Sequence, residues 1–69
     1  MERKPVTSSN LRSVGYEDGI LEVEFKSGTV FQYHNVPEHV HADMMSATSI
    51  GSFFAKNVKD SFTSSRVEM

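Results

Sequence analysis

A short segment rich in serine gives the sequence its clearest candidate for ligand chemistry. Residues 49–52 read Ser-Ile-Gly-Ser, and two lysines follow at helical spacing. The free N–H groups and the positive dipole end at the start of a helix can hold a phosphate or a carboxylate. Gly51 would allow close approach, and Ser52 would donate its hydroxyl. The pattern predicts an anion site made of Ser49, Gly51, Ser52, Lys56 and Lys59. In the plainer alternative, Gly51 only permits a turn and one serine only caps the helix.

Scattered cations form a second, weaker candidate. Arg12 and Lys26 can join the two lysines in a shallow basic face, where Tyr16 or Tyr33 would offer a base a stacking platform. The formal net charge of −2 argues against a general polyanion binder, because such affinity comes mostly from clustered Lys and Arg. The alternative is that the cations are solvated surface positions and that the aromatic residues are core.

The histidines do not predict a metal site. His39 and Asp43 have the i, i+4 spacing that places two ligands on one helix face. His39 and His41 are two apart, however, and diverge on a helix, and no further acidic or thiolate group completes a set. We therefore expect no metal and no cofactor.

Catalytic motifs are also absent from the sequence. It contains no nucleophile elbow, Walker loop, Rossmann glycine triplet or H-E-x-x-H motif. Glu22 and Glu24 share one face of an expected strand, which is also where the polar half of an amphipathic strand places its charges. We expect no catalytic residues, and the chain is not predicted to be an enzyme.

Turn residues divide the chain into strands followed by helices. Residues 20–26 alternate Leu21, Val23 and Phe25 with charged side chains, and residues 29–35 repeat the alternation after Ser27-Gly28. Residues 11–16 break the alternation once, which predicts a bulge or an irregular first strand. These segments predict a three-stranded antiparallel meander.

Two amphipathic helices are expected after the strands. Pro37 suits the first turn of a helix that ends near residue 48, and Ser49 or Ser52 can cap a second helix in which Phe54, Val58 and Phe62 recur every four residues. The predicted fold is α+β, with the meander followed by both helices on one face. Residues 1–62 are expected to form one domain, and residues 63–69 a disordered tail. The predicted core is Leu11, Val14, Leu21, Val23, Phe25, Phe31, Tyr33, Val40, Met44, Phe54, Val58 and Phe62.

Length and composition limit the classes of protein. A chain of 69 residues without cysteine forms one marginal core without disulfides, so self-association stays open. The charged N-terminal residues have no apolar signal region after them, and no apolar run reaches the length of a membrane span. We expect a cytoplasmic protein with no membrane partner.

Several short motifs occur in an order that resembles the KTSC domain family, named after the C-terminus of some lysyl-tRNA synthetases. The similarity covers about residues 6 to 62. It is carried by Ser8-Ser9, Val14-Gly15-Tyr16, Leu21-x-Val23-x-Phe25, Gly28, Phe31-x-Tyr33, Val36-Pro37 and the stretch from Ala47 to Phe54. The resemblance implies a short domain of strands followed by helices, which occurs alone in bacterial and phage proteins and attached to some of these synthetases. That context favours a role with RNA or nucleotides.

The chain departs from the family pattern near the predicted anion site. Ile50 stands where a basic or small polar residue is common, and Ala55 replaces a common Asn. His41 and Lys59 replace a usual Tyr and a frequent Arg. An anion site implied by the family would therefore be weaker in this chain.

Two functions remain in competition. The first is a non-enzymatic module that binds RNA or a nucleotide-type phosphate at the start of the second helix. The second is a protein-interaction module or small phage-type inhibitor, whose apolar surface of Met45, Ile50 and Phe53 would dock on a partner or on a second copy. An Ile50 buried in its own core would count against the second function.

Overall fold

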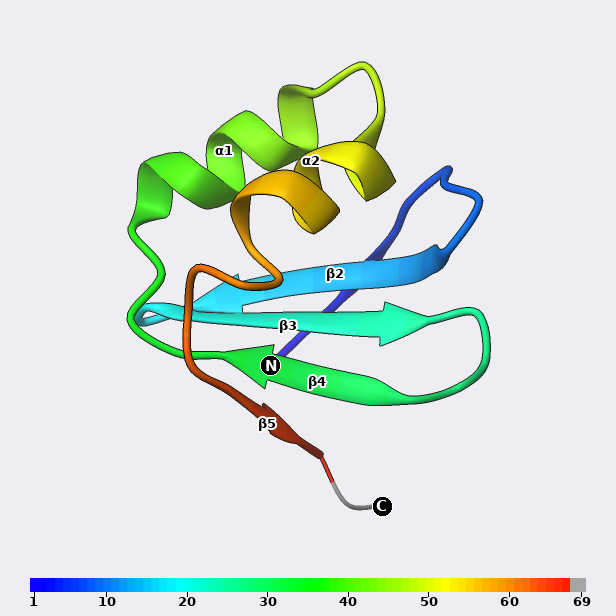
Figure 1. Cartoon of the computed structure of the whole chain (residues 1–69). Coiled ribbons are helices and arrows are strands. Elements are labelled where there is room, and N and C mark those ends of the chain that lie inside the picture. Colours follow the sequence, from blue (N-terminus) through cyan, green and yellow to red (C-terminus); the bar gives the residue numbers. More distant parts are fainter. Residues whose placement is uncertain (68–69) are drawn as a thin grey trace.

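Two short helices lie on one face of an antiparallel sheet in the computed structural model, which describes residues 1–67 (Figure 1). The sheet has the strand order β1-β2-β3-β4-β5, so every strand lies beside the strand that precedes or follows it in the sequence. The two helices lie between β4 and β5 in the chain. The α+β class is as predicted. The elements are β1 (Lys4–Pro5), β2 (Leu11–Glu17), β3 (Ile20–Phe25), β4 (Val30–Tyr33), α1 (Glu38–Ser46), α2 (Ile50–Asn57) and β5 (Ser64–Arg66).

The turns explain the register of the central hairpin. Asp18 and Gly19 both have positive φ, at 50° and 81°, which fits a two-residue turn of the primed type and pairs Glu17 with Ile20. The register of β2 against β3 shifts between Leu11 and Ser13, in the segment where the sequence predicted a bulge or an irregular strand. This shift places Val14 opposite Val23 on the face that the helices cover.

The prediction of a three-stranded meander was wrong, because the sheet has five strands. Residues 64–66, which were assigned to a disordered tail, form β5 along the free edge of β4. His34 N–H donates to the Thr63 carbonyl, and Val67 N–H donates to the Val30 carbonyl, both at 2.8 Å. All three β5 side chains are exposed, so main-chain pairing forms this strand without a hydrophobic pattern. Residues 68 and 69, also assigned to the tail, lie outside the described residues.

The core lies between the helices and the sheet. Val36 belongs to it although it was not predicted, because it leads from β4 into α1. Val30 is also buried but lies outside this cluster. Phe25, Phe31, Val40 and Phe62 are only partly buried at the margin of the core; α2 ends at Asn57, so Phe62 follows the helix. The cluster is Leu11, Val14, Leu21, Val23, Tyr33, Val36, Met44, Phe54 and Val58.

The N-terminal segment, residues 1–10, crosses β2 at Gly15. A Cβ on Gly15 would lie only 2.7 Å from the Glu2 carbonyl oxygen, so a side chain at this position would displace the crossing segment. The pairing of β1 with β2 accordingly stops at Lys4 and Val14. In Figure 1 the dark-blue N-terminal trace leaves the line of β2 and passes across the sheet.

Arg3 anchors this segment to the sheet face away from the helices. Its guanidinium donates to Ser13 Oγ at 3.1 Å and to Glu22 Oε2 at 2.6 Å. Gln32 donates to the other Glu22 oxygen at 2.8 Å, and the Ser13 hydroxyl donates to Glu24 at 2.9 Å. Because Glu22 is only 7% exposed, these donors compensate for the loss of its hydration.

Replacing Arg3 should therefore destabilise the fold. Arg3→Ala removes the charged partner of a nearly buried carboxylate and is expected to lower the free energy of unfolding by about 1–2 kcal/mol. Urea denaturation followed by circular dichroism measures this loss. In the Arg3→Ala background, Glu22→Gln should recover part of this loss, because an amide needs no cation.

The control is Arg12→Ala, whose exposed guanidinium donates one long bond of 3.3 Å. Equal losses in Arg3→Ala and Arg12→Ala would contradict the anchoring role.

Candidate functional site

A hollow lies between the start of α2, the 8–10 loop and the aromatic side chains of the sheet. Its volume is about 200 Å³. We name it the aromatic hollow. It is lined by Asn10, Leu11, Phe25, Tyr33, Gly51, Phe54, Ala55 and Lys59.

Edge-to-face contacts hold the aromatic rings of this hollow in place. The Phe54 ring lies edge-to-face with Phe25 at 5.6 Å and with Tyr33 at 5.4 Å between ring centroids. Phe31 contacts Phe25 in the same manner at 6.0 Å. Phe54 and Tyr33 are buried, whereas Phe25 is only half-buried, so Phe25 offers an accessible aromatic surface. Burial, and secondarily the charge of Asp60, raises the pKa of Tyr33, so its hydroxyl stays protonated at neutral pH.

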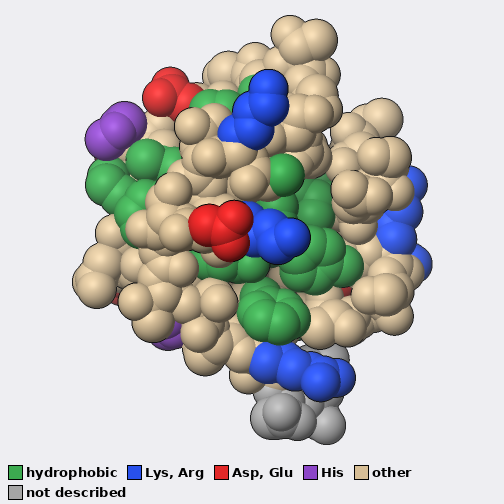
Figure 2. Space-filling model, viewed as in Figure 1, with side chains coloured by type: hydrophobic (Ala, Val, Ile, Leu, Met, Phe, Trp, Pro, Cys, Tyr) green, Lys and Arg blue, Asp and Glu red, His purple; other side chains and the backbone are tan. Residues whose placement is uncertain are grey.

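One basic residue lines the aromatic hollow, and two others are connected to it by hydrogen bonds. Lys59 is part of its lining. The main-chain N–H of Lys26 donates to the carbonyl of Asn10, a lining residue, at 2.9 Å. The Arg12 guanidinium in turn donates to the Lys26 carbonyl at 3.3 Å. All three cationic side chains are exposed. Figure 2 shows hydrophobic side chains gathered in the middle of one face, with Lys and Arg atoms among and around them and an acidic side chain beside the central cation.

The polar groups and the glycine at the start of α2 make contacts within the fold. The Ser49 hydroxyl accepts the Ser52 N–H at 3.2 Å and so caps the helix, as the plainer interpretation held. A Cβ on Gly51 would lie 3.0 Å from Ser8 Oγ, so this glycine lets the helix approach the 8–10 loop. Ser8 Oγ in turn accepts the N–H groups of Asn10 and Leu11, each at 3.2 Å.

The predicted anion-site residues fall on two neighbouring stripes of α2 and its C-terminal extension. Gly51 and Lys59 line the aromatic hollow. Ser49, Ser52 and Lys56 are exposed beside it but do not line it. Sequence reasoning missed Asn10 and Ala55 as lining residues. A loop asparagine and a helical alanine carry no pattern of their own, and only the contact of Gly51 with the 8–10 loop brings them together.

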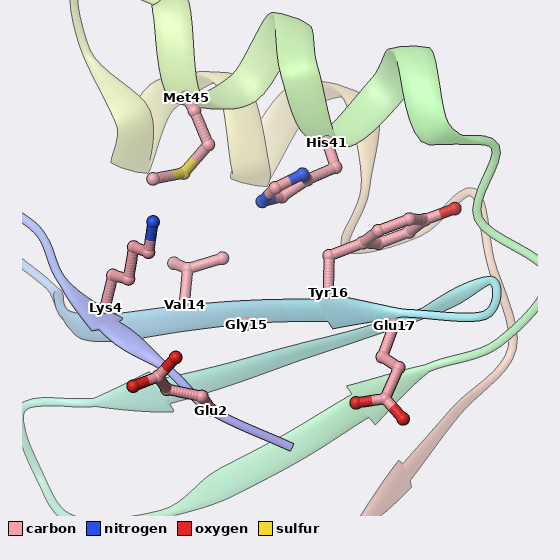
Figure 3. A pocket seen from close by; sticks show the side chains of 8 residues that line it. All are labelled: Glu2, Lys4, Val14, Gly15, Tyr16, Glu17, His41 and Met45. Atoms are coloured by element: carbon pink, nitrogen blue, oxygen red, sulfur yellow. The ribbon is translucent and has the colours of Figure 1, made fainter.

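A second hollow of about 550 Å³ lies at the edge of β2 under α1 (Figure 3). We name it the edge hollow. The Tyr16 and His41 rings stack at 4.9 Å with an interplanar angle of 8°, and Tyr16 Oη donates to the Val36 carbonyl. Tyr16 was predicted to share a face with Arg12 and Lys26, but it lies at the other end of β2. The lining residues are Glu2, Lys4, Val14, Gly15, Tyr16, Glu17, His41 and Met45.

The apolar surface expected for a protein partner is only partly exposed. Met45, Ile50 and Phe53 are half-buried and pack against the core. Within residues 1–67, Met1 is the large hydrophobic residue that is exposed, at 48%. Over the same residues, neither helix is long and apolar enough to cross a membrane, and no group of three His, Cys, Asp or Glu side chains is placed to hold a metal ion.

Comparisons with known proteins agree with the fold. The family model of the KTSC domain matches residues 7–62. A crystal structure of a KTSC domain protein from Yersinia pestis is 39% identical, superposes with a TM-score of 0.93, and is matched over 97% of both chains. An uncharacterised protein of Stutzerimonas stutzeri is 46% identical over 56 residues, or 78% of this chain and 79% of that protein. A Tsukamurella paurometabola protein is 36% identical over 61 residues, or 86% of this chain and 91% of its own.

The chain therefore belongs to the KTSC domain family, as its motifs indicated. The Ser8-Ser9 motif and the Ser-Ile-Gly-Ser segment, far apart in the sequence, meet at the contact between Ser8 and Gly51. Val14-Gly15-Tyr16 forms, with Glu17, the part of β2 that lines the edge hollow.

The stacked histidine predicts a pH dependence of stability. Burial lowers the pKa of His41 from its ordinary value of 6.5, and the nearby Glu38 charge opposes this only in part. The unfolded chain therefore takes up this proton at a higher pH than the folded chain. His41 contributes stability that is complete above pH 6.5 and is lost as pH falls through its lowered pKa.

Urea denaturation at a series of pH values from neutral to mildly acidic tests this effect. His41→Phe keeps an aromatic ring on Tyr16 and removes the titration, so it should lose less stability than the wild type on acidification. His39→Phe is the matched control on an exposed helix position. Equal losses in the wild type and His41→Phe would show that another group is responsible.

Proposed function

We propose that this domain is a non-enzymatic module that binds single-stranded RNA or a nucleotide-type phosphate at the aromatic hollow. The observation that carries the proposal is the half-buried Phe25 ring in a hollow with Lys59 in its wall and Lys26 and Arg12 beside it. Single-stranded nucleic acids are bound in this manner, with bases on aromatic rings and phosphates near cations.

The geometry suggests how the ligand would lie. One base would enter the hollow against Phe25, where the Asn10 side chain can bond to the edge of the base. The adjoining phosphates would face Lys59 on one side and Lys26 and Arg12 on the other. Ser52 and Lys56, on the neighbouring stripe of α2, would contact a flanking phosphate. In this arrangement the residues predicted for an anion site would form the margin of a hollow that binds a base.

The charge balance implies modest affinity. Three cations beside the hollow allow about three phosphate contacts, so the logarithm of the binding constant should fall with the logarithm of salt concentration with a slope of about −2. The formal net charge of −2 opposes tighter non-specific binding.

The proposal involves no reaction on the ligand. Glu22 and Glu24, the carboxylate pair noted in the sequence, lie on the other face of the sheet and are bonded to Arg3, Gln32 and Ser13. Both carboxylates accept hydrogen bonds in the network that holds the N-terminal segment. We also propose that the protein is cytoplasmic, because RNA and nucleotides are available there.

An amide NMR titration with an oligouridylate of about eight nucleotides tests the site. Shifts are expected at Asn10, Gly51, Phe54 and Lys59, and they should weaken as salt is raised. Uridine monophosphate should shift the same amides at higher concentration. An unchanged spectrum at low salt, or shifts centred away from the hollow, would contradict the proposal.

Substitutions separate the contributions of charge and stacking. Lys59→Ala should weaken oligouridylate binding about three- to ten-fold and make the salt slope shallower by about 0.7. Phe25→Leu keeps an apolar side chain and should weaken binding by about ten-fold through lost stacking. Lys4→Ala is the charge-matched control, because Lys4 lies in the edge hollow. Equal effects of Lys4→Ala and Lys59→Ala would indicate a general charge effect and no defined site.

A further inference from the structure

The edge of β2 is open at Tyr16. In an antiparallel ladder, successive residues direct their N–H and C=O groups alternately to the two sides of the strand. Glu17 closes the two-residue turn opposite Ile20, and Gly15 faces Glu22, so these two residues bond toward β3. The main-chain groups of Tyr16 therefore point to the outer edge. β1 stops pairing at Val14, and within residues 1–67 no hydrogen bond reaches the Tyr16 N–H or C=O.

The open edge results from the crossing at Gly15. A continued β1 would place Glu2 opposite Tyr16 and pair with it. The chain instead crosses at Gly15, and Arg3 binds Glu22 on the far face of the sheet. The free donor and acceptor of Tyr16 are thus left beside a hollow of about 550 Å³.

The two sides of the edge hollow differ in chemistry. Toward α1, its wall consists of Val14, Met45 and the stacked rings of Tyr16 and His41. In Figure 3 the carboxylates of Glu2 and Glu17 lie on the side of β2 away from α1, whereas Lys4 extends toward Met45. The hollow is therefore mainly apolar toward the helix and acidic on the opposite side of the strand.

We propose that the edge hollow binds an extended peptide segment in which one apolar residue is flanked by two basic residues. The apolar residue pairs with Tyr16, exchanging both main-chain hydrogen bonds with it, and its side chain points toward Met45. Because side chains alternate along a strand, its two neighbours point to the opposite side. One basic neighbour meets Glu17 and the other meets Glu2. Lys4 lies on the apolar side and disfavours a basic residue at the central position.

This site is independent of the proposed nucleic-acid site. Leu11, at the start of β2, lines the aromatic hollow, and Glu17, at its end, lines the edge hollow. The two sites share no lining residue. Failure of one proposal therefore leaves the other standing.

A peptide titration followed by amide NMR tests the proposal. The probe is the capped tripeptide Lys-Leu-Lys, acetylated and amidated so that its ends carry no charge. Shifts are expected at Gly15, Tyr16 and Glu17 and not at Asn10 or Lys59. The same tripeptide with an N-methylated leucine loses the donor to the Tyr16 carbonyl and should bind about five-fold more weakly. The capped tripeptide Glu-Leu-Glu should not bind measurably, because its carboxylates meet Glu2 and Glu17.

Protein variants complete the test. Glu17→Gln changes an exposed side chain and should weaken Lys-Leu-Lys binding about two- to five-fold, as should Glu2→Gln. Lys59→Ala should leave peptide binding unchanged and weaken only oligouridylate binding. Equal binding of the N-methylated and unmodified peptides would overturn the main-chain pairing. Equal binding of Glu-Leu-Glu and Lys-Leu-Lys, or no shift with any peptide, would overturn the site.

Discussion

The path of the N-terminal segment is the constraint on which the rest of this structure depends. Two close approaches fix it, and each is made at a glycine. At Gly15 the Glu2 carbonyl crosses β2 where a Cβ would lie 2.7 Å away, and at Gly51 the Ser8 hydroxyl meets α2 where a Cβ would lie 3.0 Å away. The first approach leaves the edge of β2 open beyond Val14, and the second brings the 8–10 loop to the aromatic rings. Both hollows therefore follow from the position of one short segment.

Polar contacts support this arrangement where a small core cannot. A domain of this length buries limited apolar surface, so each buried charge needs compensation. The nearly buried Glu22 receives donors from both Arg3 and Gln32, and the N-terminal segment is held by that requirement. The outer strands, of two and three residues, are short, which limits the edge that each sheet margin presents to other chains. The contact of Arg3 with Glu22 therefore stabilises the fold and also holds the crossing beside the edge hollow.

The local patterns predicted the middle of the fold better than its margins. Alternation in residues 20–26 identified β3, and the capping serines, Ser49 or Ser52, located the start of α2, where the structure has Ser49 as the cap. Both signals lie within a few residues. β5 could not be predicted from Ser64–Arg66, whose exposed side chains bear no pattern and whose pairing with β4 is made by the main chain. Of the residues predicted for an anion site, Gly51 and Lys59 line the aromatic hollow, but the other lining residues include some that are distant in sequence. The edge hollow was missed because the crossing at Gly15 is a contact between two backbones.

Native-state amide hydrogen exchange tests the central claim most directly, because it compares neighbouring residues of one strand. If the N-terminal segment leaves β2 at Gly15, the Tyr16 amide exchanges rapidly while the Val14 amide, paired with β1, and the Gly15 amide, paired with β3, remain protected. Protection of Tyr16 equal to that of Val14 would show that β1 continues along β2. The crossing at Gly15 and the open edge would then both be wrong.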